Sequence, residues 1–143
     1  MSTEENKQVL RRWTEEWNRG NIEGVYALFA QDFVDHHPQP GQAPGLEGLR
    51  RTLGQLFAAF PDSQLTVELL VAEEDEVADC GTLTGTHKGS LFGIPPTGRK
   101  VTIRFVDIHR FKDGKITEAW HLEDIFAALQ QIGAIPALQS AHA

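Results

Sequence analysis

Hydrophobic and polar positions divide the chain into a helical first part and an extended second part. Up to about residue 60, apolar residues recur every three or four positions, which is typical of amphipathic helices. Gly20 and Pro61 are natural stops, and Asn21 is a good N-cap. The pattern therefore predicts helices over 9–17, 22–29 and 46–60, with a short extended segment over 33–38 and a loop over 39–45.

After residue 62 the period of the pattern changes to two, which is typical of half-buried strands. Leu65, Val67, Leu69 and Val71 alternate with polar residues, and a second strand is predicted over 76–88. Glycines at 81 and 85 indicate bends or bulges in that strand. A loop over 89–100, two further strands over 101–111 and 116–123, and a helix over 124–132 complete the prediction.

Asp113-Gly114 lies between the last two predicted strands and is a strong hairpin signal, because both central residues of a type I′ turn need positive φ. Pairing about this turn sets Lys112 opposite Lys115 and Asp107 opposite Trp120, with His121 one residue further on. The hairpin therefore places an acid and a titratable base within one or two strand positions of each other.

The order of elements predicts an α+β fold with a curved antiparallel sheet and helices collected on one face. Such a sheet, closed by its helices, forms a cone-shaped α+β barrel around an internal pocket, and pockets of this kind hold ligands. With 143 residues and 41% hydrophobic positions, residues 1–143 are expected to form a single domain with its own core.

Composition excludes several classes of protein. The net charge is −7 and the basic residues are scattered, which argues against nucleic-acid binding and against affinity for anionic membranes. No apolar run approaches the roughly 18 residues of a membrane span. A single cysteine, Cys80, excludes an internal disulfide and a thiolate metal cluster. The N-terminal residues show no signal-peptide pattern, so a cytoplasmic protein is expected.

Several short motifs, weak singly but specific in their order and spacing, resemble the SnoaL-like polyketide cyclase and predicted ester cyclase family of the nuclear-transport-factor-2-like superfamily. The likeness covers roughly residues 6–136. The motifs are Asp35-His36, Gly45-Leu-Glu-Gly48, Phe60-Pro-Asp62, Gly85-Thr-His87 with Gly89, Gly93-Ile-Pro-Pro-Thr-Gly-Arg99, Asp113-Gly-Lys-Ile116, Trp120 and Gln131-Ile-Gly133.

The resemblance implies a cone-shaped α+β barrel, a homodimer through the sheet, and an acid–base pocket that needs no cofactor. In the polyketide cyclases the reaction is an intramolecular aldol closure, with an aspartate on the last strand as general acid–base and a histidine on the preceding strand assisting. Aligned through Asp-Gly-Lys-Ile, the aspartate position falls on His121 and the histidine position on Asp107. The two residue types are exchanged. The Thr-rich outer face of the sheet also favours the dimer.

His121 is the first candidate for a general base, because an imidazole titrates near neutrality and Asp107 could hold its tautomer. The alternatives are a half-exposed strand histidine, and an Asp107 that forms a salt bridge with Arg104 or Arg110. Phe105, Asp107 and His109 share an apolar strand face, so an acid there is paired or has a perturbed pKa.

Other residues are candidates for the pocket with weaker support. His87 and His36 are expected to hydrogen-bond a substrate oxygen, with Asp35 and His109 as lesser candidates, and glycines 81 and 85 are expected to leave room for a ligand beside His87. Asp124 is a substrate-binding candidate or an N-cap of the last helix. Aromatic side chains are expected to wall the cavity, among them Trp17, Phe105 and Trp120.

The sequence holds six histidines, but their spacing matches no metal motif, and no metal is expected. The nearest to a cluster is His36-His37 with His87 or His121. The leading hypothesis is a cofactor-independent enzyme that moves protons on a small hydrophobic carbonyl compound. The alternatives are a module that binds such a molecule without chemistry, and a water-activating hydrolase. The last needs acids flanking an arginine, and Arg104 is expected on the face opposite Asp107.

Overall fold

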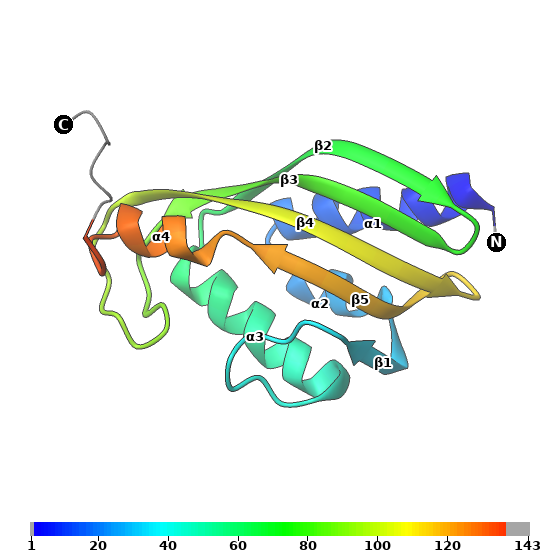
Figure 1. Cartoon of the computed structure of the whole chain (residues 1–143), viewed down its shortest axis with the longest axis horizontal. Helices are drawn as coiled ribbons and strands as arrows, with labels where there is room; N and C mark the ends of the chain where they lie inside the picture. Colours follow the sequence, from blue (N-terminus) through cyan, green and yellow to red (C-terminus); the bar gives the residue numbers. More distant parts are fainter. Residues whose placement is uncertain (1, 137–143) are drawn as a thin grey trace.

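The computed structural model describes residues 2–136 and shows a five-stranded sheet with helices packed against one face (Figure 1). The predicted order of helices and strands is confirmed. The elements are α1 (Thr3–Asn18), α2 (Ile22–Tyr26), β1 (Phe29–Asp35), α3 (Gly45–Ala59), β2 (Gln64–Glu73), β3 (Glu76–Thr86), β4 (Lys100–Lys112), β5 (Lys115–Glu123) and α4 (Ile125–Gln131).

The sheet has the order β1-β5-β4-β3-β2, and the α+β class is confirmed. Strands β2 to β5 are antiparallel neighbours, whereas β1 runs parallel to β5. The expectation of a purely antiparallel sheet is therefore wrong at one edge, and the sheet is open rather than closed into a barrel. Because no hairpin joins β1 to β5, local sequence does not determine the direction in which β1 pairs.

Local signals account for the starts of α1 and α2. Ser2 and Glu5 form a capping box at α1, and the Asn21 side chain accepts a hydrogen bond from the Gly24 amide at the start of α2. The second helix ends at Tyr26, so the helix predicted to residue 29 is too long. Phe29 instead opens β1, pairs with Ile116 of β5 and is buried. Pairing in the sheet overrides the helical spacing there.

Two irregularities in strand pairing decide which side chains meet on the inner face of the sheet. The hairpin turn forms as predicted, with positive φ at Asp113 and Gly114, and Lys112 pairs with Lys115. The register then shifts by one residue between Phe111 and Arg110. The predicted pairing of Asp107 with Trp120 is wrong for this reason, and Asp107 lies directly opposite His121.

The second irregularity is a bulge in β2 between Val67 and Leu69, opposite Gly81. A Cβ atom on Gly81 would lie 1.9 Å from the carbonyl oxygen of Thr66, so only glycine fits this close approach. Bulges increase local twist, and this one contributes to the curvature of the sheet over the helices. The bulge expected near Gly81 is confirmed, although the extra residue belongs to the neighbouring strand.

The two faces of the sheet differ in what they contact. The inner face buries the core against α1 and α3, while the outer face exposes a row of apolar side chains. None of the helices in residues 2–136 is long and apolar enough to cross a membrane. The exposed apolar residues of the outer face are Val34, Leu69, Val71, Val106, Ile108 and Leu122.

The homodimer expected from the sequence stays a prediction, and this outer face is where we expect it to form. Exposed apolar patches on a sheet mark surfaces that associate. Light scattering at micromolar concentration is expected to give twice the chain mass, and Leu122→Lys is expected to lower it to the monomer. Phe126→Lys, which changes an exposed apolar residue on α4, is the control. A wild-type monomer would contradict the prediction.

Candidate active site

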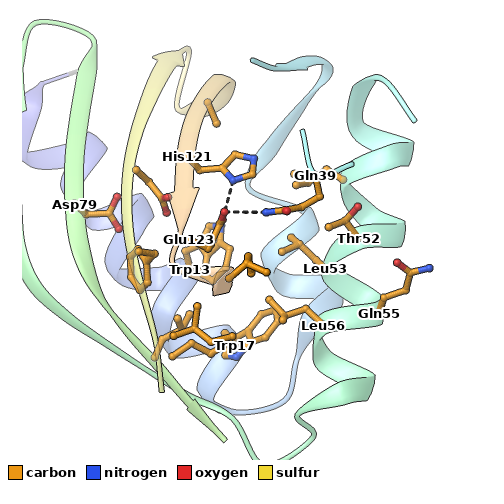
Figure 2. A pocket seen from close by; sticks show the side chains of 18 of the residues that line it. Trp13, Trp17, Gln39, Thr52, Leu53, Gln55, Leu56, Asp79, His121 and Glu123 are labelled. Carbon is orange, nitrogen blue, oxygen red and sulfur yellow. Dashed lines mark hydrogen bonds and ion pairs between the residues drawn. The ribbon is translucent and has the colours of Figure 1, made fainter. Parts of the chain in front are cut away.

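A cavity of about 370 Å³ lies between the inner face of the sheet and helices α1 and α3 (Figure 2). Its wall is mainly apolar, and Trp17 and Phe105 belong to it as expected. This volume and lining suit a small, largely hydrophobic ligand. The other large apolar and aromatic lining residues include Leu10, Trp13, Phe29, Phe33, Leu49, Leu53, Leu56, Leu83, Leu91, Phe92, Ile103 and Ile125.

Titratable side chains form a band across the sheet at one side of the cavity. Asp79, Asp107 and His121 are direct neighbours on β3, β4 and β5, because Asp107 pairs with Asp79 on one side and His121 on the other. His109 and Glu123 lie two residues further along β4 and β5 and line the same cavity. Side chains two residues apart on a strand share a face, so these five groups point the same way.

His121 is held by two carboxylates at once. Its Nε2 lies 2.9 Å from both carboxylate oxygens of Asp35, and its Nδ1 lies 2.7 Å from Oε1 of Glu123. Figure 2 shows the contact with Glu123. A carboxylate only accepts hydrogen bonds, so both ring nitrogens must donate, and only the imidazolium form does so. The geometry therefore assigns a positive charge to His121.

The loop after β1 holds both carboxylates in place. Asp35 accepts hydrogen bonds from the His37 amide and from the Gln42 side chain, and its side chain is almost fully buried. Glu123 accepts one from Gln39, as Figure 2 shows. The side chains around His121 thus come from β1, β5 and the loop between β1 and α3.

These contacts determine the protonation state of His121. Burial alone would lower its pKa, but the hydrogen bonds and charges of Asp35 and Glu123 raise the pKa to about 10. Burial would raise the pKa of Asp35, yet its bonds to His121, Gln42 and the His37 amide hold that pKa below the usual value. At neutral pH His121 is therefore an imidazolium, and Asp35 beside it is ionised.

Asp107 has a different environment, although it is the cross-strand partner of His121. Its Oδ1 is buried and has no hydrogen-bond partner among residues 2–136. Burial raises the pKa of Asp107 to about 7, with the nearby carboxylates of Asp79 and Glu123 adding to the effect and His109 opposing it. A carboxyl group with this pKa can gain and lose a proton at neutral pH.

The expectation that Asp107 holds the tautomer of His121 is wrong. Asp35 and Glu123 occupy both ring nitrogens, which leaves Asp107 free of that role. Asp107 also forms no salt bridge with Arg104 or Arg110. Arg104 is exposed on the outer face, and Arg110 bonds Glu76 and Glu118 there.

The structure places two of the predicted pocket residues on the outer side of the sheet. His36 lies 2.9 Å from Glu118 and stacks on Trp120, with ring centroids 4.5 Å apart. The Arg110 guanidinium lies over the Trp120 ring. Neither His36 nor Trp120 lines the cavity. The expectation that they do is wrong. The register shift in β5 sets His121 opposite Asp107, so Trp120 points outward, and His36 stacks on Trp120 there.

His87 and Asp124 also lie outside the cavity lining. His87 is fully buried, with its Nδ1 3.0 Å from the Thr97 hydroxyl. The space expected at the neighbouring glycine is filled, since a Cβ on Gly85 would lie 2.9 Å from Phe60. Asp124 caps α4 by accepting a hydrogen bond from the Ala127 amide, which was the alternative considered for it.

Three acids at the site, two in the band and one bonded to His121, were missed or ranked low from the sequence. Glu123 and Asp79 were not considered, although strand alternation puts Glu123 on the face of His121 and Asp79 on the face of Gly81. Asp35 was ranked below its neighbour His36. Its contact with His121 depends on the parallel pairing of β1 with β5, which no local pattern indicates.

Residues that could hold a metal ion differ from those considered from the sequence. His36, His37, His87 and His121 are not brought together. Within residues 2–136, two groups each place one ligand-type atom per residue within 4.8 Å of the others. The first is Asp79, Asp107 and His109, and the second is Asp107, His121 and Glu123.

Comparisons with known proteins agree on one family. The sequence model of the SnoaL-like polyketide cyclases matches residues 7–132. The aklanonic acid methyl ester cyclase DauD from Streptomyces sp. (strain C5) is 26% identical over 131 residues, which is 87% of this chain and 80% of DauD.

Solved structures give the same result. AclR from Streptomyces galilaeus, a candidate hydroxylase, is 30% identical with a TM-score of 0.88, over 99% of this chain and 88% of AclR. IdmH from Streptomyces antibioticus, a candidate polyketide cyclase, is 32% identical with a TM-score of 0.78, over 90% of this chain and 98% of IdmH.

The contacts of His121 predict its titration. By NMR, its imidazole is expected to stay protonated until the pH nears about 10, and Asp35→Asn should move the midpoint down. Because the two carboxylates raise the pKa of His121 above the ordinary value of 6.5, they stabilise the folded state. Their contribution to the free energy of unfolding is fully present below pH 6.5 and is lost as the pH rises to about 10. Asp35→Asn should therefore destabilise the fold more at pH 6 than at pH 10.

Glu118→Gln is the matched control, since it removes a carboxylate from the imidazole of His36 outside the cavity. It should leave the His121 midpoint unchanged. A wild-type His121 that titrates at the midpoint of a free histidine would contradict the prediction.

Proposed function

The chain belongs to the SnoaL-like polyketide cyclase family, and on that premise we propose that it closes a ring by intramolecular aldol addition without a cofactor. The main support for this proposal is the environment of Asp107. Asp107 is a partly buried carboxyl group with a pKa of about 7, on the wall of an apolar cavity. An acid–base catalyst works best when its pKa lies near the working pH.

In the proposed reaction Asp107 carries a single proton through the whole cycle. Its carboxylate removes a proton from a carbon next to a carbonyl group, which leaves an enolate. The enolate carbon attacks a second carbonyl carbon of the same molecule, and a carbon–carbon bond forms while the C=O π bond opens to an alkoxide. Asp107 then returns the proton to the alkoxide oxygen. The product is an isomer of the substrate.

In this proposal His121 is not the general base expected from the sequence. With a pKa of about 10 it is already protonated at neutral pH and cannot serve as the general base. Its positive charge instead offsets the repulsion among the acids around it, and so supports ionisation of Asp107. The exchange of acid and imidazole positions relative to the family thus leaves the carboxyl group as the base.

The lining of the cavity favours a neutral, hydrophobic substrate. Its titratable lining holds more acids than imidazoles, and no lysine or arginine of residues 2–136 is among its lining residues. A free carboxylate would be repelled there, whereas an ester would not. DauD is named for acting on aklanonic acid methyl ester, so this compound is the first probe to try.

The proposal predicts turnover that depends on Asp107. Purified protein, with chelator and no added cofactor, is expected to convert the ester probe to a cyclised product of unchanged mass, followed by liquid chromatography and mass spectrometry. Asp107→Asn should lower kcat by about 100-fold or more, the usual contribution of a general acid–base group. The rate of the wild type should rise with pH through about 7 as Asp107 ionises.

Asp113→Asn changes an aspartate in the turn of the same hairpin and is the control, with wild-type rates expected. Full activity of Asp107→Asn would refute the assignment of the base. A product heavier by one oxygen atom would indicate hydroxylation, the activity considered for AclR. Tight binding of the ester without any turnover would favour the alternative of a non-catalytic binding protein.

A further inference from the structure

A second group of titratable side chains lies beside Asp107, on the side away from His121. Asp79 is the cross-strand partner of Asp107 on β3, and His109 lies two residues along β4 on the same face. Both side chains line the cavity, and Asp79 and His109 are only 8% and 7% exposed. The reaction proposed above uses neither of them.

Polar atoms of this group face one another with no other partner. Asp79 Oδ1, Asp107 Oδ1 and His109 Nδ1 are buried without a hydrogen bond to any residue in the range 2–136. The three residues bring ligand-type atoms within 4.8 Å of one another, and His109 Nδ1 lies 3.5 Å from Asp79 Oδ1. Unpaired buried polar atoms are costly. A positive charge on His109, whose Nδ1 lies 3.5 Å from Asp79 Oδ1, offsets part of this cost.

We propose that Asp79 and His109 form a second imidazole–carboxylate dyad, whose positive charge on His109 keeps Asp107 ionisable inside the apolar cavity. His109 is then a positioning residue that acts through Asp107. This inference deepens the proposed function and rests on the role of Asp107 as the base.

The surrounding charges explain why His109 has this role. The charged groups near Asp107 all come from the sheet, since the lining residues of α1 and α3 are uncharged. The positive charge of His121 is already balanced by the two carboxylates bonded to it. His109 has only one neighbouring carboxylate, that of Asp79, besides Asp107. The charged groups are Asp79 on β3, His109 on β4, and His121 and Glu123 on β5, with Asp35 of β1 bonded to His121 on its far side.

Asp107 needs such a counter-ion to act as a base. Burial and two neighbouring carboxylates raise its pKa, and His109 is the foremost group that opposes them. The pKa of His109 is itself raised: burial lowers it, but the contact with Asp79 more than compensates. Without the charge on His109, a smaller fraction of Asp107 would be ionised at neutral pH and able to take a proton from a substrate.

The test is a titration of Asp107 that needs no substrate. Carbon-13 NMR of carboxyl-labelled aspartate follows the ionisation of Asp107, whose signal is assigned by its loss in Asp107→Asn. His109→Gln is expected to raise the Asp107 midpoint by about one pH unit, since a nearby opposite charge lowers a carboxyl pKa by about 1–3 units. His87→Gln, a fully buried histidine outside the cavity lining, is the matched control and should leave the midpoint unchanged.

Activity provides a second readout. If the midpoint rises from about 7 to about 8, the ionised fraction at pH 7 falls about five-fold, and kcat/KM should fall with it and recover at higher pH. A structural defect would lower activity at every pH. If the ester is not turned over at all, the proposed function fails, while the carboxyl titration still decides the inference.

Two results would overturn the inference. One is an unchanged Asp107 midpoint in a folded His109→Gln protein. The other is stoichiometric binding of Zn²⁺ or Mn²⁺ by chelator-treated wild type, with loss of the His109 and Asp107 signals, which would assign the group to a metal ion. If His109→Gln does not fold, the wild type decides: its His109 ring resonances must shift with the same midpoint as Asp107, and no shift there refutes the coupling.

Discussion

The imidazolium of His121 between Asp35 and Glu123 is the interaction on which the rest of the site depends. It joins the edge strand β1 to β5 on the inner face, where backbone pairing alone is short and interrupted. It also draws in the loop after β1, because Gln42 and Gln39 bond the two acids. Charge-assisted hydrogen bonds of this kind are about twice as strong as neutral ones.

The same interaction separates two acids by function. Asp35 is bonded on several sides and stays ionised, while Asp107, two strands away, has a buried oxygen without a hydrogen-bond partner and titrates near neutrality. Environments that push the pKa values of neighbouring carboxyl groups apart are how one site obtains both a fixed charge and a movable proton. Here the separation arises from hydrogen bonds, since both acids are buried.

Local patterns predicted most of the fold, because periodicity and turn residues report on local geometry. The hairpin at Asp113-Gly114 and the face shared by Phe105, Asp107 and His109 followed from such signals. The contacts that failed were non-local. The register shift beyond Phe111 moved Trp120 outward, and the parallel pairing of β1 brought Asp35 to His121. Neither the register shift nor the parallel pairing produces a recognisable pattern in the neighbouring sequence.

The family resemblance was also unable to predict non-local contacts. It placed the expected site on β4 and β5, and it compared only the positions of Asp107 and His121. It could not show that His121 is an imidazolium bonded to Asp35 and Glu123, and for this reason the base that we propose differs from the one expected. Residue type at an aligned position does not determine protonation state, because the groups bonded to it do.

The apolar wall of the cavity and its titratable band come from different parts of the chain. Helices α1 and α3 supply much of the wall, and the strands of the sheet supply the charges. Substitutions in the helices can therefore reshape the space offered to a molecule and leave the proton-handling groups undisturbed. A chain built in this way can drift towards new substrates during evolution without having to rebuild its chemistry each time.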